Sequence, residues 1–437
     1  MKRERRIIGT AAACLAGAVL AALTACGAQE NGGMNLIGAG EENARSVVLF
    51  SPMEKTDPNA ENAARSATDK TVLMAEELLG VEVKYTTYTA ENYQERTYDQ
   101  VAIDRIRSDM DDIYLLNPDV ILAMGEEGRL VDLSGLESAE NLREVVKTAN
   151  VVDGKLVAIP QEVVAYGLFL NRDMFDRYGI RLPETPEDFL ECCRIFQENG
   201  IETPVGANRW WLETFVFAQA YADLYNGENT EAEIAALNSG ERKYSGYMRP
   251  GFEFLQELIR QGYIDPEEAL VREAIEGEGA DFLAQKTPIV MAYWGAANTE
   301  TAYGAPDFKM QVIGFPSSRG QMPVIPMTGY GVGVGAAHRE DALDVLEVMI
   351  SDEALQVYAE ANRVISPSRN VEVECIPALE PLYDRIKEDV YVLGSNAGMK
   401  LEQWGNVCQL VRMLLGGATV DECMAELDRL QEETLEK

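Results

Sequence analysis

The run VVLFSP at residues 47–52 opens the folded part of the chain and points to its fold class. Its four apolar residues predict a buried strand that ends at the Ser-Pro pair. An amphipathic helical stretch follows around residues 62–79, and residues 81–85 (VEVKY) then alternate as a second strand. Strands that alternate with helices of this length predict βαβ units and a parallel sheet, and therefore an α/β fold.

The same alternation leads to a third strand, where two candidate site residues lie at strand ends. Residues 91–110 predict a helix, and residues 112–116 (DIYLL) predict a strand that stops before Asn117. In parallel α/β sheets, ligands bind beyond the carboxyl ends of the strands. Ser51 and Asn117 occupy such ends. Both are therefore candidates for ligand contact, with an ordinary turn role as the alternative.

Local signals place several later elements. Residues 120–133 predict an amphipathic helix, the Asp-Gly turn at residues 153–155 predicts a hairpin, and Thr185 with Asp188 predicts a capping box at a helix start. Residues 328–335 (TGYGVGVG) fit neither phosphate-binding glycine pattern, so we expect a glycine-interrupted strand there. Further strands are expected at 156–159, 166–171, 288–293 and 311–315, and further helices at 211–225, 230–238, 247–261, 266–285, 339–350 and 352–361.

Charge and cysteine content exclude several classes of function. The chain carries 73 acidic and 38 basic residues, a net charge of −35, which argues against nucleic acid or an anionic bilayer face as a partner. The cysteines show no CxxC spacing, so neither a zinc site nor a full disulfide framework is indicated, and no metal or cofactor is expected. A bridge between Cys408 and Cys423 stays open. The cysteines are at positions 14, 26, 192, 193, 375, 408 and 423.

The first residues are typical of a secretory signal. Four basic residues precede an apolar, Ala-rich run at 7–23, and the sequence LTACG follows. A basic head, a short apolar run and small residues at the cleavage point predict a signal peptide over residues 1–25 that is too short to span a membrane comfortably. LTAC resembles the bacterial lipobox, which implies a lipid on Cys26. Residues 26–45 then form the lipid anchor and a Gly-, Asn- and Glu-rich flexible tether.

A series of short motifs, in a fixed order, carries a resemblance to a known family. The chain resembles the extracellular solute-binding proteins of family 1, the mostly sugar-binding receptors of bacterial ABC importers. The matching passages extend from about residue 47 to about residue 430. They are GRL-DL at 128–133, DGK to IP at 153–160, LNRDMF at 170–175, YGI at 178–180, TPEDF at 185–189, YWG at 293–295, and the helix at 339–350 with SDEA at 351–354 and a turn at Pro367.

The resemblance implies a two-lobed periplasmic-binding-protein-like fold of type II. A hinge between the lobes lets them close on a ligand. Lobe 1 would comprise residues 46–159 plus 317–363, and lobe 2 residues 160–316 plus 364–437. The family also implies a monomeric receptor outside the cytoplasm, held at the cell membrane through lipidated Cys26. Such a receptor captures a small solute, most often a sugar or oligosaccharide, and presents it to the permease subunits of an ABC importer.

Sugar sites combine aromatic faces with fixed polar groups, and the chain has four tryptophans. Trp294 follows a strand end, Trp404 begins a helix, and Trp210 and Trp211 lie at a strand-to-helix junction. The resemblance implies that aromatic residues at these places line the ligand site, with ordinary packing as the alternative. The polar candidates are Glu162, Tyr166, Asn298 and Tyr330. Arg209 and Arg319 are expected to form surface ion pairs, with an anionic ligand as the alternative partner.

Enzyme signatures are missing from the sequence. The only histidine, His338, cannot form HExxH, GxSxG is absent, and no spacing singles out a catalytic carboxylate pair, so we expect no enzyme. Two alternatives to the importer function stay open. One is a binding module that feeds a membrane sensor, and the other is the same receptor role for a solute that is not a sugar.

Overall fold

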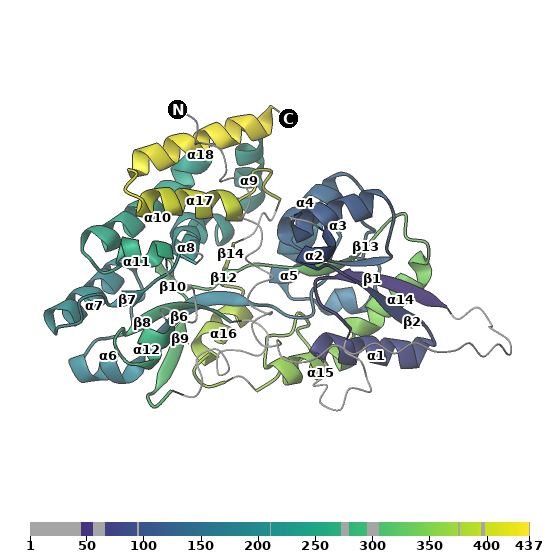
Figure 1. Ribbon diagram of the computed structural model, residues 1–437, viewed down its shortest axis with the longest axis horizontal. Coiled ribbons are helices and arrows are strands. Elements are labelled where there is room, and N and C mark those ends of the chain that lie inside the picture. The colour runs from purple at the N-terminus through teal and green to yellow at the C-terminus, as the bar shows by residue number, and fades with distance from the viewer. Residues whose placement is uncertain are drawn as a thin grey trace.

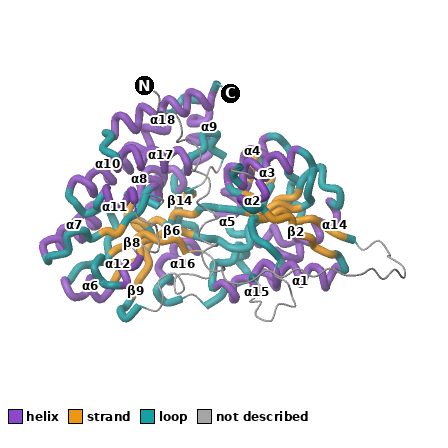
Figure 2. The backbone as a smooth tube through the Cα atoms, in the orientation of Figure 1, coloured by secondary structure: helices purple, strands orange, loops and turns teal. Residues whose placement is uncertain are grey.

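The protein has two lobes, each built on its own β-sheet, in a computed structural model (Figure 1). Strands lie in the middle of each lobe and helices cover them (Figure 2). None of the described helices combines the length and apolarity needed to cross a membrane. The structure describes residues 45–55, 66–93, 96–209, 211–271, 279–294, 306–374, 376–394 and 398–436.

The first lobe contains a four-stranded sheet in the order β13-β3-β1-β2. β1 (Ser46–Ser51) pairs in parallel with β2 (Glu82–Thr87) and β3 (Ile113–Leu116), as the sequence predicted. β13 (Gly329–Val332) joins β3 in antiparallel register from much later in the chain. The helices of this lobe are α1 (Ala67–Leu79), α2 (Ala90–Tyr93), α3 (Tyr98–Arg107), α4 (Pro118–Glu126), α5 (Glu144–Asn150), α14 (Arg339–Met349) and α15 (Asp352–Asn362), with a 3-10 turn at Glu137–Asn141.

The second lobe is built around β6 (Ala165–Asn171), every residue of which is buried. β6 pairs in antiparallel register with β8 (Ile289–Trp294), β9 (Met310–Ile313) and β12 (Val324–Ile325), while β7 (Val205–Gly206) and β14 (Val392–Leu393) lie at the two edges. β10 (Phe315–Ser317) and β11 (Gly320–Met322) form a separate hairpin. The helices are α6 (Arg172–Tyr178), α7 (Pro186–Glu198), α8 (Glu213–Tyr225), α9 (Thr230–Ser239), α10 (Tyr244–Arg260), α11 (Pro266–Val271), α12 (Ala280–Leu283), α16 (Glu380–Lys387), α17 (Trp404–Leu415) and α18 (Val420–Leu435).

The chain crosses between the lobes along paired backbone segments. Ile159 bridges Tyr330, and Val163 bridges Ile365, both in antiparallel sense. One apolar cluster includes Leu49 of β1 and Phe169 of β6, so the two lobes share part of their core near these crossings. The lobe boundaries given above stay a proposal, and backbone pairing suggests adjustments: residues 367–369 pair with residues 141–143 of the first lobe. Residues 317–325 go with the second lobe, because β12 pairs with β6 and β14.

Two local signals are confirmed in detail. The backbone N–H of Asp188 donates to Thr185 Oγ1 at 3.2 Å and the Thr185 N–H donates to the Asp188 carboxylate at 3.2 Å, so the capping box starts α7. The hairpin of β4 (Val151–Val152) and β5 (Lys155–Leu156) turns through Asp153 and Gly154, whose φ angles are 49° and 75°. Two consecutive positive φ angles are what a type I′ turn requires.

Several predicted element boundaries were wrong. The helix expected at 91–110 is divided into α2 and α3, because Thr97 starts a new helix with its own capping box. The helix expected at 120–133 begins at Pro118 and ends at Glu126, since Gly128 has φ 65° and the chain then returns to the sheet at Leu130. The strand expected at 156–159 is regular only at its first residue. The helix expected at 266–285 appears as α11 and α12, with residues 272–278 outside the described chain.

The described cysteines are all free thiols. Cys192 and Cys193 on α7 are buried, as are Cys408 and Cys423. The possible bridge between Cys408 and Cys423 is therefore not formed, and the Cys423 thiol instead donates to the backbone oxygen of Leu410 at 3.5 Å. Burial raises the pKa of all four thiols, which keeps them protonated and unreactive.

Candidate functional site

Three of the predicted ligand-binding aromatic residues lie together on the second lobe. The ring of Tyr166, near the start of β6, is 6.2 Å from the ring of Trp211 and 5.4 Å from the ring of Trp404, centroid to centroid. Trp211 precedes α8 and Trp404 is the first residue of α17, so distant parts of the chain meet here. Tyr166 is buried, whereas both indoles keep part of their surface exposed. We call Tyr166, Trp211 and Trp404 the aromatic cluster.

Trp404 is held in place by its neighbours. Its ring lies 5.6 Å from that of Phe217 on α8. Gln403, almost fully buried, accepts a hydrogen bond from the Tyr221 hydroxyl at 2.6 Å and donates to the Leu401 carbonyl at 2.6 Å, which fixes the start of α17. The indole packs directly on the backbone of Gly394, because a Cβ at that position would stand 2.7 Å from Cζ3 of Trp404. The indole orientation is therefore set by packing.

A glycine-to-alanine pair tests this arrangement without any ligand. Gly394→Ala is expected to shift the indole of Trp404, change the near-ultraviolet circular dichroism and lower the free energy of unfolding by ~1–3 kcal/mol, the usual effect of overpacking. Gly135→Ala is the matched control, because nothing lies within 4 Å of its Cβ position and its φ is not positive. An unchanged near-ultraviolet spectrum in Gly394→Ala would show that Gly394 does not set the indole position.

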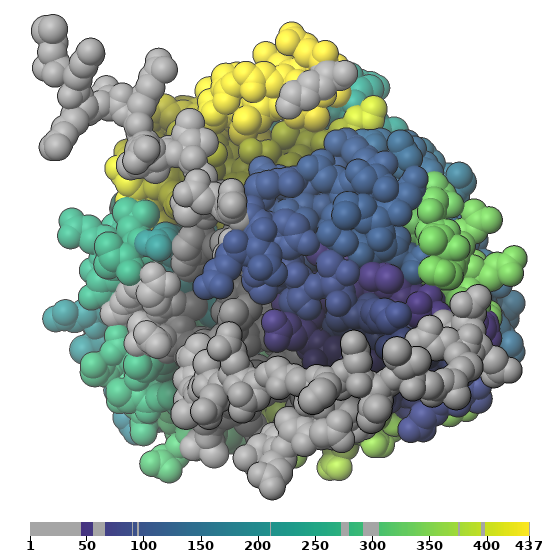
Figure 3. Space-filling view, turned by 45° about the vertical axis from the view of Figure 1, so that its right-hand side comes forward, coloured from purple at the N-terminus to yellow at the C-terminus, as the bar shows by residue number. Residues whose placement is uncertain are grey.

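Polar groups of the first lobe meet the second lobe beside the aromatic cluster. Asn117 precedes α4 without capping it, and its Nδ2 donates to Oδ1 of Asp99 on α3 at 2.8 Å. Burial raises the pKa of Asp99, and the Asn117 hydrogen bond offsets part of that shift. Asp119, in the first turn of α4, lies close enough to Glu402, two residues before Trp404, to lower the pKa of its carboxyl. Figure 1 shows α4, in blue, on the side of the first lobe that faces α17 and α18, in yellow, and in Figure 3 the blue surface of the first lobe adjoins the yellow surface of the C-terminal residues.

Glu402 is anchored at the start of α17. Its carboxyl oxygens accept hydrogen bonds from the backbone N–H groups of Gly405 at 2.6 Å and Asn406 at 3.0 Å. Burial raises the pKa of Glu402, the two N–H donors and Asp119 lower it, and the negative charge of Asp99 raises it again. Sequence reasoning missed Asp99, Asp119 and Glu402, because acidic residues are abundant in this chain and no local signal distinguishes these three.

The remaining polar candidates lie away from the aromatic cluster, make a turn contact, or fall outside the described residues. Ser51, buried at the end of β1, accepts a hydrogen bond from the Met53 N–H at 3.0 Å, which is a turn contact. Tyr330 is buried in β13 near the crossings. Burial raises the pKa of its hydroxyl, a hydrogen bond with Thr68 lowers it, and the negative charge of Glu162 raises it. Glu162 and Tyr330 therefore share an environment with each other. Trp210, Asn298 and the side chain of Trp294 lie outside the described structure.

The two arginines discussed in the sequence make structural contacts. Arg319 pairs with Asp223 at 2.5 Å on the surface, as expected. Arg209 donates to the backbone oxygen of Leu270, which ties the segment before Trp211 to α11. Neither contact indicates recognition of an anionic solute.

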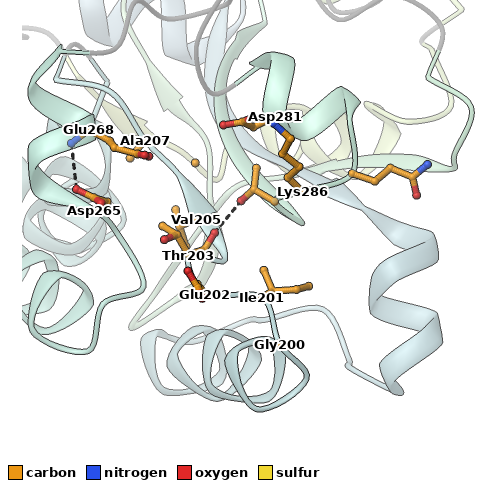
Figure 4. Close-up of a pocket in the computed structure, with 13 residues that line it drawn as sticks. Gly200, Ile201, Glu202, Thr203, Val205, Ala207, Asp265, Glu268, Asp281 and Lys286 are labelled. Carbon is orange, nitrogen blue, oxygen red and sulfur yellow. Dashed lines mark hydrogen bonds and ion pairs between the residues drawn. The ribbon is translucent and has the colours of Figure 1, made fainter.

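A cavity of about 490 Å³ lies beside β7, at the edge of the sheet opposite β14 (Figure 4). Its walls include Thr203, Asp265, Glu268 and Lys286, and Lys286 is paired with Asp281 at 2.9 Å. Thr287 donates to the backbone oxygens of Thr203 and Pro204, just before β7. None of the predicted site residues lines this cavity. Within the described residues no group of three His, Cys, Asp or Glu side chains is arranged to hold a metal ion.

Comparisons with known proteins identify the family. The family model for bacterial extracellular solute-binding proteins matches residues 66–356. The melibiose/raffinose/stachyose-binding protein MelE of Bacillus subtilis (strain 168) is 23% identical over 266 residues, which cover 56% of this chain and 60% of MelE. The match thus spans less than two thirds of that relative's length.

Solved structures share the fold. A family 1 extracellular solute-binding protein from Bifidobacterium longum subsp. infantis superposes with a TM-score of 0.70 at 16% identity, covering 89% of this chain and 99% of that one. The apo form of RafE from Streptococcus pneumoniae gives a TM-score of 0.69 at 14% identity, covering 91% and 100%. These likenesses confirm the predicted two-lobed α/β fold. The chain belongs to the bacterial extracellular solute-binding proteins, a family of binding proteins and not of enzymes, as the sequence predicted.

Proposed function

We propose that the chain is a monomeric receptor that captures a sugar or oligosaccharide between its lobes and presents it to the permease subunits of an ABC importer. The observation that carries the proposal is the aromatic cluster of Tyr166, Trp211 and Trp404 beside the carboxyls of Asp119 and Glu402. A sugar ring has apolar faces and a rim of hydroxyls. Partly exposed indoles can stack on the faces while fixed carboxyl and amide groups accept and donate hydrogen bonds at the rim.

The relatives support a sugar over other solutes. MelE is named for binding melibiose, raffinose and stachyose, which are neutral sugars. Sites for such ligands need hydrogen-bond acceptors more than positive charge, and Asp99, Asn117, Asp119 and Glu402 supply acceptors on both sides of the lobe boundary. The proposed mode of capture is hinge closure, with the backbone crossings at residues 159–165, 325–329 and near 365 as the hinge.

The N-terminal residues support a location at the outer face of the cell membrane. The family name places these proteins outside the cytoplasm. The basic head, the apolar run and the LTAC sequence add a signal peptide over residues 1–25 and a lipid on Cys26. The tether over residues 26–45 would let the receptor reach the permease while it stays anchored.

A thermal-shift screen tests the proposed function. The processed protein is heated with mono- and oligosaccharides, polyols, amino acids and peptides, with melibiose, raffinose and stachyose included. A solute that binds only the folded state adds about 2.7 kcal/mol of stability at a hundredfold excess over its dissociation constant, so a clear rise in melting temperature is expected with a sugar. A shift produced by another solute class alone would contradict the sugar assignment. No shift with any solute would contradict solute capture.

A further inference from the structure

A buried hydrogen bond between Tyr221 and Gln403 attaches α8 to the residue that precedes Trp404. The Tyr221 hydroxyl donates to Oε1 of Gln403 at 2.6 Å, and Nε2 of Gln403 donates to the Leu401 carbonyl at 2.6 Å. Tyr221 and Gln403 are each 1% exposed. Water therefore does not compete for these bonds, and neither side chain is accessible to a solute.

Tyr221 acts on the indole of Trp404 by two routes. Through the hydrogen bond it holds Gln403, and the backbone of Gln403 sets the direction in which the next side chain leaves the start of α17. Through its ring it stacks on Phe217 at 5.9 Å, and the Phe217 ring lies 5.6 Å from that of Trp404. A phenylalanine at position 221 keeps the ring and removes the hydroxyl, so the two routes can be separated.

We propose that Tyr221 and Gln403 are positioning residues of the sugar site, which hold the indole of Trp404 in the orientation that stacks on the solute. This inference rests on the proposed function. Neither residue touches the sugar, and both act through Trp404. An indole that is already oriented loses less conformational freedom on binding, and this preorganisation strengthens affinity without any added contact.

Tyr221→Phe is expected to weaken sugar binding by about 3- to 10-fold, which is the range for ordering one additional side chain on binding. Isothermal titration calorimetry with the best sugar from the thermal-shift screen measures the change. Tyr225→Phe is the matched control, because it lies one turn further along α8 and its buried hydroxyl has no hydrogen-bond partner among the described residues. It should bind the sugar as the wild type does.

A double-mutant cycle separates a positioning role from a general loss of stability. In the Trp404→Ala background, Tyr221→Phe should change affinity by less than about twofold, because the residue through which Tyr221 acts is gone. Gln403→Met removes the same hydrogen bond from the other side with an unbranched side chain of similar length. It should weaken binding at least as much as Tyr221→Phe does.

A second measurement needs no sugar. In protein labelled with nitrogen-15 at its four tryptophans, the indole N–H signal of Trp404 should move in Tyr221→Phe and stay in place in Tyr225→Phe. The signal is assigned by its loss in Trp404→Ala.

The outcomes separate this inference from the proposed function. Three results each overturn the positioning role and leave the receptor function intact: wild-type affinity in Tyr221→Phe or Gln403→Met, an equal loss of affinity with and without Trp404, or an unmoved indole signal in Tyr221→Phe. Failure of the wild type to bind any sugar in the screen overturns both.

Discussion

Trp404→Ala is expected to weaken sugar binding by about 30-fold or more. The indole of Trp404 is the member of the aromatic cluster nearest to Glu402 along the chain, and it stands partly exposed at the start of α17. Loss of a stacking aromatic anchor in a binding site typically costs about 2 kcal/mol or more, which corresponds to about 30-fold in affinity. Isothermal titration calorimetry with the best sugar from the thermal-shift screen measures the change.

A loss of stability must be told apart from a loss of contact in this variant. Trp404 also packs on Phe217, so its removal lowers the melting temperature. Tyr178→Ala is the matched control, because Tyr178 is a partly buried aromatic residue of the same lobe that packs on Phe196 at 5.9 Å, away from the aromatic cluster. It should lower the melting temperature and leave affinity unchanged. Sugar affinity within twofold of wild type in Trp404→Ala would remove Trp404 from the site.

Glu213→Gln is expected to stabilise the protein at alkaline pH by several kcal/mol. Glu213 begins α8 and is fully buried, and burial raises its pKa from 4.5 to about 8, with smaller opposing contributions from its own backbone, Cys408 and Arg412. The raised pKa means that the folded protein holds this proton more tightly than the unfolded chain. The contribution of Glu213 to stability is therefore complete below pH 4.5 and is lost as the pH rises through about 8.

The size of this effect follows from the shift. Each pKa unit corresponds to about 1.4 kcal/mol, so the loss between the two pKa values is on the order of 4–5 kcal/mol. A glutamine side chain cannot ionise, and the free energy of unfolding of Glu213→Gln should therefore vary less between about pH 5 and 9 than that of the wild type. Urea unfolding across this range measures it, with the exposed change Glu198→Gln as control. Parallel curves for Glu213→Gln and wild type would contradict a buried, protonated Glu213.

Local sequence signals predicted much of the fold because they act over a few residues. The Thr185 capping box, the positive φ angles at Asp153 and Gly154, and the alternation of strands and helices from residue 46 each depend on neighbours in the chain. The boundaries failed where two local signals compete. Thr97 divides a continuous helical pattern into two helices. Gly128 ends the next helix, although the apolar residues of its pattern continue to Leu133.

The candidate site was predicted in part. Tyr166, Trp211 and Trp404 were named from residue type and from the resemblance, and the structure brings them together. Whether they bind the solute stays a prediction, as does the role of Trp210, Trp294 and Asn298. The proximity of Asp119 to Glu402 was not predicted, because they are two acidic residues among 73 and lie far apart in the chain.

The sequence by itself determined the fold class, the family and the aromatic candidates, because periodicity, capping and turn chemistry are written in neighbouring residues. The tertiary structure alone decided which distant side chains share an environment. It placed the Trp404 indole on Gly394 and buried the Glu213 carboxyl completely. Burial and proximity set protonation and ring orientation, and neither can be read from residues that are far apart in the chain.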